Sequence, residues 1–301
     1  MEPATAPNAA GDLAPAPAPA TASARVKRKS IPFWRKSLAL NLGIIIVAFV
    51  FFVGFFPGLI APYNPNTQNA DLMLQAPSAA HILGTDNYGR DILSRVIWAT
   101  RADLQIGLIG TAIPFVFGTL VGLLAGYYGG VIDQILMRLV DIVVAFPFIV
   151  LVIAIIAFLG PGIYNLYMAI SLVGWVPYAR IIRGEVLVAK NLDYVSAARV
   201  LGYSDWRIIL RHILPNVLSS SIVYTAADVV FCMLAGASMG FLGLGVQPPT
   251  PEWGQAISEG RVFIARAWWL STFPGFALVF VGTGFSLLGD GLSDLLRTKG
   301  R

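Results

Sequence analysis

Long runs without a charged side chain constrain this chain more than any other feature. No Asp, Glu, Lys or Arg occurs in Ser37–Ala70, Leu104–Ile132 or Ile142–Ala179. A transmembrane helix needs about 20 mainly apolar residues. Charged residues make up only 12% of the whole chain, about half of the ~25% found in soluble domains. The sequence therefore predicts a multi-pass membrane protein.

The runs predict an all-α fold with six transmembrane helices. The third run is too long for one helix, and the turn-forming Gly160–Gly162 divides it in two. Two later runs add the fifth and sixth spans. They are Ile213–Pro251, interrupted only by Asp228, and Ala267–Gly289. Four prolines fall inside expected spans, where neighbouring helices can support a kink: Pro114, Pro147, Pro177 and Pro274.

These patterns divide the chain into four parts. Residues 1–33 are rich in Ala and Pro and predict a disordered tail. Residues 34–62 hold the N-terminal transmembrane helix, and 63–101 form an exterior segment that ends in an interfacial helix. Residues 102–298 form the transmembrane core, which includes a loop at 184–216.

Basic residues predict the orientation of the chain. With the N-terminus inside, the inside segments hold sixteen Lys and Arg residues and the outside segments hold five. Positive residues collect on the cytoplasmic side, so we expect both termini to be cytoplasmic and the protein to lie in the cytoplasmic (inner) membrane. The same arginines account for the net charge of +5, so we expect lipid as a partner and no nucleic acid.

The loop at 184–216 reads as two short helices. Asp193 can cap a first helix that runs to Leu201, and Gly202 suits its C-terminal end. Ser204 can cap a second helix, which Pro215 would limit. Such a hairpin can present a rigid surface to a partner, or it can lie flat on anionic lipid. The pattern alone leaves both readings open.

This loop carries a family resemblance. The stretch "SAARVLGYSDWRIILRHILP" resembles the EAA loop of binding-protein-dependent ATP-binding cassette (ABC) importer permeases, with Ser196 in place of the family's Glu. The stretches His81–Gly107 and Gly240–Gly254, and the later "LLGDGLSDLLR", are similar to the dipeptide/oligopeptide/nickel subfamily. Matching loop residues are Ala197, Ala198, Gly202, Leu214 and Pro215.

The resemblance implies a fold and a set of partners. The fold is the type I ABC importer permease (MetI-like) core with an extra N-terminal span. The partners are a second homologous permease subunit, one or two ABC ATPase subunits and an exterior solute-binding protein, with di- or oligopeptides as the default cargo. In the family the loop couples transport to the ATPase, which assigns that role to these residues: Ala197, Ala198, Gly202, Tyr203, Ser204 and Asp205.

Any ATP that drives this chain must be hydrolysed on another polypeptide. The chain has no G-x-x-x-x-G-K-[ST] loop, and without one it lacks the phosphate cradle of an ATPase. We therefore expect no cofactor in this chain, with ATP and Mg²⁺ on partner ATPase subunits, and no catalytic residue. His81, His212 and Cys232 do not have metal-ligand spacing, so no metal site is expected.

Asp228 is the acidic residue expected deepest in an apolar run. An intramembrane carboxylate faces a cavity or pairs with a partner. Asp228 therefore either lines the translocation path, where it could meet a substrate amine, or bonds to a neighbouring helix through Thr225 or a nearby hydroxyl. A proton-coupled role would fit the alternative function, an ion-coupled secondary transporter that acts without an ATPase.

The exterior segment carries the remaining candidates. Asp86, Arg90 and Asp91 can pair with one another in a packed cap, and the resemblance places this segment near the docking face for a solute-binding protein. The tryptophans of Gln247–Trp269 are typical of interfacial anchors. Three glycines spaced by four predict close helix packing, within this chain or against a sister permease: Gly118, Gly122 and Gly126.

Overall fold

The computed structural model describes residues 38–299, and the side chains of residues 38–296. The tail predicted for residues 1–33 lies outside these ranges. The described part is helical, with one isolated β-bridge between Thr85 and Asp91, so the all-α prediction is confirmed. Its helices are α1 Leu38–Phe55, α2 Pro57–Ile60, α3 Ile92–Tyr128, α4 Gly130–Val144, α5 Phe148–Leu159, α6 Ile163–Ala189, α7 Asp193–Val200, α8 Asp205–Ile208, α9 Leu214–Phe241, α10 Trp253–Gly260 and α11 Trp269–Lys299.

The number of spans differs from the six expected. Four helices of the described chain are long and apolar enough to cross a membrane, and the bent pair α4 and α5 gives a fifth. Helix α6 is not among these spans, although its 27 residues, about 40 Å at 1.5 Å per residue, are long enough to cross a membrane. Its Asn165, Arg180 and Arg183 lower its hydropathy, and the charge-free run that we expected to span ends at Ala179.

The second expected span is longer than its charge-free run. We predicted an interfacial helix from Leu93 and a separate span from Leu104, but one helix, α3, runs through both with 37 residues. Asp91 is the N-cap of α3, and its side chain accepts a 2.8 Å hydrogen bond from Ser94 N. Gly129 and Gly130, both with positive φ, end it and turn the chain into α4.

The predicted break at Gly160–Gly162 is confirmed, and a second break occurs earlier. Helix α5 ends at Gly160, with φ +91°, and α6 begins at Ile163. Pro147 does not kink a continuous span as expected, because it lies in a turn where α4 and α5 meet at 84°. The other three prolines lie inside α3, α6 and α11.

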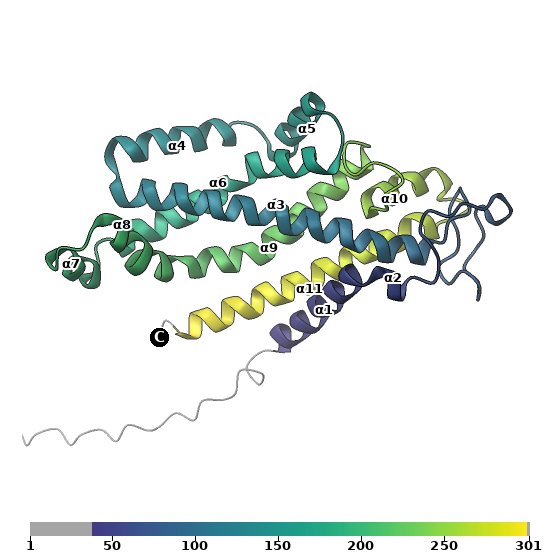
Figure 1. Ribbon diagram of the computed structural model, residues 1–301, viewed down its shortest axis with the longest axis horizontal. Helices are drawn as coiled ribbons and strands as arrows, with labels where there is room; N and C mark the ends of the chain where they lie inside the picture. The colour runs from purple at the N-terminus through teal and green to yellow at the C-terminus, as the bar shows by residue number, and fades with distance from the viewer. Residues whose placement is uncertain (1–37, 300–301) are drawn as a thin grey trace, which may run out of the picture. The chain divides into compact units, whose positions relative to one another are not determined.

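Close packing of α3 against α6 forms the centre of the bundle (Figure 1). A Cβ at Gly118 would lie 2.3 Å from Trp175 O, and one at Gly122 would lie 2.6 Å from Ala179 O. Only glycine lets the two backbones approach this closely. The glycine stripe of α3 therefore serves packing within this chain.

The remaining long helices complete the bundle. Helix α9 packs on both α3 and α6, while α1 pairs with α11. Gly43 of α1 lies against the backbone of Leu288, and Gly291 of α11 lies against Leu40. Helices α7 and α8 lie at one end of these helices, and residues 62–91 and α10 lie at the other (Figure 1).

Candidate functional site

Residues 190–213, which we call the hairpin, connect α6 to α9. The turn between α7 and α8 is centred on Gly202, whose φ of +77° suits glycine. Tyr203 N donates a 3.2 Å hydrogen bond to Ala198 O and closes the turn. The prediction that Gly202 ends the first helix is therefore confirmed.

The ends of the two hairpin helices differ in part from the prediction. Leu192 is the N-cap of α7 and Asp193 is its first residue, so Asp193 is not the capping side chain. Ser204 occupies the N-cap position of α8, but its side chain makes no capping hydrogen bond. Pro215 does not limit the second helix, because α8 continues through the π-helical Ile209–Ile213 into α9. In the first turn of α9 the missing N–H of proline is tolerated.

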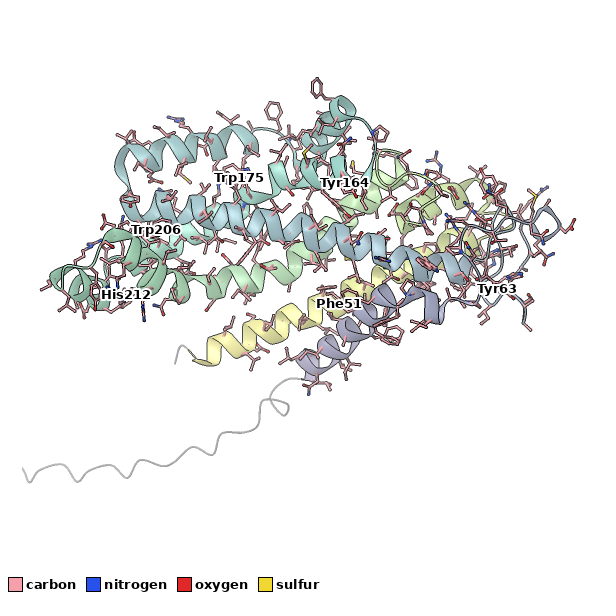
Figure 2. The ribbon with its side chains drawn as sticks, in the orientation of Figure 1. Phe51, Tyr63, Tyr164, Trp175, Trp206 and His212 are labelled. Atoms are coloured by element: carbon pink, nitrogen blue, oxygen red, sulfur yellow. The ribbon has the colours of Figure 1, made fainter. Side chains whose placement is uncertain are left out.

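The outer surface of the hairpin presents exposed apolar side chains next to charged ones such as Arg199 and Arg207. Val200 is 88% exposed, Leu201 70% and Trp206 54%. A Cβ at Gly202 would meet no atom within 4 Å. Figure 2 shows Trp206 and His212 at the hairpin end of the helices. Of the residues predicted to couple to an ATPase, Ala198 is buried and Tyr203 half-buried, and the others are exposed: Ala197, Gly202, Ser204 and Asp205.

The hairpin is fastened to the C-terminal end of α3. The Tyr127 hydroxyl donates a 2.6 Å hydrogen bond to Asp205 Oδ1, and the Arg199 guanidinium lies 5.6 Å from the Tyr127 ring centroid. Lys190 Nζ donates a 2.7 Å hydrogen bond to Gly126 O, a carbonyl in the last turn of α3. Sequence analysis missed Tyr127, because a tyrosine at the end of an apolar run is typical of any interface.

The inner face of the hairpin is a buried apolar cluster. Ile208, Ile209 and Ile213 are at most 1% exposed, and they pack with side chains of α3 and α6. Side chains that fill such a cluster cannot shift independently of their neighbours. The hairpin is therefore one packed unit with the ends of α3, α6 and α9.

Asp228 lies between helices in the middle of α9. It is 5% exposed, and its Oδ2 accepts a 2.9 Å hydrogen bond from the Tyr178 hydroxyl of α6. The Tyr178 ring in turn contacts Tyr224, edge to face, with centroids 5.0 Å apart. Thr225 is not the partner, because its hydroxyl donates to Ser221 O. Of the two readings left open, this conformation shows the bond to a neighbouring helix.

Residues 63–91, which we call the cap segment, hold a buried ionic network. Arg90 pairs with Asp86 through Nε and with Glu259 through Nη2 at 2.8 Å. Asp91 does not join this pair, since its Oδ1 lies 2.9 Å from His81 Nδ1 and its Oδ2 caps α3. Gly84 and Gly89 make the turns expected of them, with φ of +78° and +70°.

Two of the three tryptophans around α10 are buried and do not act as interfacial anchors. Trp253 is 1% exposed, and its Nε1 donates a 3.1 Å hydrogen bond to Val96 O of α3. Trp269 is also buried, and of the three tryptophans of Gln247–Trp269 only Trp268 is more than half exposed. The aromatic pattern alone cannot separate these cases, because buried and interfacial tryptophans have the same apolar neighbours.

Two buried carboxyl groups meet beside Trp253, and sequence analysis did not single them out. Asp103 of α3 is 0% exposed and Glu252, the N-cap of α10, is 1% exposed. Asp228 is thus not the only deeply buried acid. Burial raises the pKa of Glu252 to about 7. Within residues 38–296, no three His, Cys, Asp or Glu side chains are grouped to hold a metal ion.

Comparison with known proteins identifies the family. Residues 118–300 match the family described as binding-protein-dependent transport system inner membrane component. The chain is 40% identical to the dipeptide transport system permease protein DppC of Alkalihalophilus pseudofirmus over 272 residues, 90% of each chain. It is also 40% identical to the glutathione transport system permease protein GsiD of Pectobacterium atrosepticum over 271 residues, 89% of this chain and 90% of the relative.

A solved structure agrees on the fold. A chain of the inward-facing MetNI methionine ABC transporter superposes with a TM-score of 0.55 at 20% identity, over 70% of this chain and 97% of the other. With the family match and the 40% identical relatives, this structure establishes the MetI-like fold predicted from the sequence. The chain therefore belongs to the binding-protein-dependent transport system inner membrane components, the membrane-spanning permease subunits of ABC importers.

Proposed function

We propose that this chain forms, with a second homologous permease subunit, the translocation path of an importer for dipeptides or short oligopeptides. An exterior solute-binding protein delivers the peptide, and one or two ABC ATPase subunits drive the cycle. Two relatives support this cargo, because their names describe them as dipeptide and glutathione transport permeases. Family membership does not favour the alternative, an ion-coupled carrier.

The exposed apolar hairpin is the observation that carries this proposal. Val200, Leu201 and Trp206 are large apolar side chains that the described part of the chain leaves uncovered. An amphipathic helix that docks in a groove of a partner uses such side chains as anchors. Because the hairpin packs rigidly on α3, α6 and α9, a movement of the partner would be transmitted through the hairpin to these helices. ATP and Mg²⁺ would be bound by that partner.

This chain has an apolar groove against which the second permease could pack. A groove of about 650 Å³ runs between α3 and α6, with Ile113 and Tyr164 on its rim. Its other lining residues are mostly apolar or aromatic: Ile109, Phe117, Tyr167, Met168, Ser171, Leu172 and Trp175. Figure 2 labels Tyr164 and Trp175 of α6, two of the lining residues. Such a surface fits a helix of a homologous subunit with lipid excluded.

The orientation that we propose places both termini in the cytoplasm. The hairpin then faces the ATPase, and the cap segment faces the binding protein. Asp86, Arg90 and Asp91 are each at most 5% exposed. They would therefore act by holding the shape of the docking face, while exposed cap residues such as Tyr88 would touch the binding protein.

Asp228 would enter the path only in another conformation. In alternating access, α6 and α9 change their separation, and the Tyr178–Asp228 hydrogen bond is one contact that such a motion breaks. The freed carboxylate could then accept a peptide amine. If Asp228→Asn leaves peptide uptake unchanged, Asp228 has no part in the mechanism.

Co-purification tests the hairpin proposal. A tag on this chain should retain an ABC ATPase, and Gly202→Trp should abolish that retention because a large side chain would block close approach. Gly160→Trp is the matched control, because Gly160 also has a positive φ and open space but lies outside the hairpin. Equal retention by both variants would contradict the proposal.

A further inference from the structure

The N-terminus of α10 is capped by two carboxyl groups from different parts of the chain. Both oxygens of Glu252 accept backbone hydrogen bonds, Oε1 from Gly254 N at 2.6 Å and Oε2 from Gln255 N at 2.7 Å. Asp103 Oδ2 accepts the remaining one, from Trp253 N at 3.2 Å. The first turn of α10 is thus held to α3 by acidic groups.

The two carboxyl groups are enclosed without a positive partner. Among the described residues no Lys, Arg or His nitrogen forms an ion pair with Asp103 or Glu252. The backbone of α9 closes the site, since a Cβ at Gly240 would clash with Glu252 Oε2. Two adjacent ionised carboxylates cannot both be stable in such a place, because burial and like-charge repulsion act together.

One oxygen of the pair is left without a partner. Asp103 Oδ1 is buried and accepts no hydrogen bond, whereas both Glu252 oxygens are occupied by N–H donors. The two carboxyl groups meet at the same helix end, because Asp103 Oδ2 and both Glu252 oxygens accept from three consecutive backbone N–H groups of α10. A proton on Asp103 Oδ1 would satisfy that atom and give Glu252 a further donor, while a proton on Glu252 would oppose an N–H group.

We propose that Asp103 and Glu252 form a proton-binding site, in which one proton on Asp103 Oδ1 is donated to the Glu252 carboxylate and locks α10 onto α3 and α9. The ligand is a proton because the described residues place no third His, Cys, Asp or Glu side chain with these two carboxyl groups to hold a metal ion. The site is independent of the cargo and of the ATPase, so it stands or falls separately from the proposed function.

Other titratable groups face this site, and they define the background of its titration. Tyr167 of α6 lies near Asp103. A small cavity that Glu252 lines also contains Arg95 of α3, Asp86 of the cap segment and Glu259 of α10. Asp86 and Glu259 are paired with Arg90, and none of these groups touches the unpartnered Oδ1.

Release of this proton would loosen α10. A carboxyl group whose pKa is raised in the folded state stabilises the fold below its unfolded pKa, and this stabilisation is lost as the pH rises through the folded pKa. This stabilisation is therefore lost as alkaline titration removes the proton from the pair. Helix α10 would therefore separate from α3 and α9 more readily in alkaline medium.

Infrared spectroscopy of the full chain in lipid nanodiscs tests the proposal directly. At neutral pH the wild-type protein should show the C=O stretching band of a buried protonated carboxyl group, and alkaline titration should remove it. Asp103→Asn should lack this band. The matched control is Asp141→Asn, which removes an exposed carboxylate from a surface ion pair and should leave the band unchanged.

Thermal unfolding gives a second readout that does not depend on assignment of the band. The wild-type unfolding midpoint should fall as alkaline titration removes the proton, whereas Asp103→Asn should lose this dependence because its amide mimics the protonated acid. Glu252→Gln should fold less stably than Asp103→Asn, since its NH₂ group opposes a backbone N–H. Equal pH profiles, or a band that persists in Asp103→Asn, would overturn the proposal.

Discussion

The Tyr127 hydroxyl lies 2.6 Å from Asp205 Oδ1 and donates a hydrogen bond to it. Tyr127 belongs to the last turn of α3, and Asp205 is the first residue of α8, so this bond joins the long central helix to the hairpin. A partner that moves the hairpin would pull on α3 as well as on α6 and α9, to which the hairpin is covalently linked.

Loss of this bond should weaken coupling more than folding. We expect Tyr127→Phe to lower peptide uptake per ATP hydrolysed several-fold, while stability falls by about 1 kcal/mol, the typical net value of one hydrogen bond. Uptake and ATP hydrolysis measured together in proteoliposomes would show this. Tyr128→Phe is the control, because Tyr128 is 45% exposed. If both variants couple as well as the wild type, the link transmits nothing.

Close packing of α3 on α6 should not tolerate a larger side chain. Gly122→Leu would place atoms inside the α6 backbone near Ala179, so we expect little folded protein, with overpacking that costs at least 1–3 kcal/mol. Gly184→Leu, on an open face of α6, should fold normally. Size-exclusion chromatography in detergent separates the outcomes, and a monodisperse Gly122→Leu peak would show that the interface can adjust.

The cap segment should depend on Arg90. Removal of one partner of a buried ion pair typically costs about 3–5 kcal/mol. Arg90→Gln leaves Glu259 without its cation and leaves Asp86 with only Arg95, at 3.7 Å. We expect faster proteolysis of residues 63–91 and weaker capture of the binding protein. Arg101→Gln, which removes an exposed arginine, should change neither; equal proteolysis of the two variants would argue against the network.

The Tyr178 hydroxyl should stabilise the buried Asp228 carboxylate. Tyr178→Phe removes the hydroxyl that donates to the buried carboxylate, and an unpaired buried charge costs about 1–3 kcal/mol or more. We therefore expect a lower unfolding midpoint, and we expect Asp228→Asn in the same chain to recover part of the loss. Additive effects of the two substitutions would show that the residues are not coupled.

Much of this fold could be predicted from hydrophobic runs and turn residues. The charge-free stretches located the apolar helices, and the Gly202 turn followed from a single glycine between two short helices. The span boundaries failed where a helix continued past its apolar run, as α3 does from Ile92. Pro147 shows the converse, because a proline inside an apolar run gives no sign of whether it kinks a helix or ends it.

The site was less accessible from the sequence, because its contacts join distant segments. Asp103 and Glu252 are 149 positions apart by their numbers, and neither belongs to a pattern that marks it as buried. Tyr178 is likewise one aromatic residue among many in α6. The resemblance to a family assigned a coupling role to the hairpin residues as a group, and only the structure shows that one of them, Asp205, is bound to Tyr127.

Transport driven by different energy sources tests the central claim most directly. The claim is that an ATP-hydrolysing partner grips the hairpin around Gly202. Proteoliposomes that contain this chain, its sister permease, the ATPase and the binding protein should take up a labelled dipeptide only with ATP, and Gly202→Trp should abolish uptake. Uphill uptake by this chain alone on a proton or sodium gradient, without ATP or an ATPase, would contradict the account.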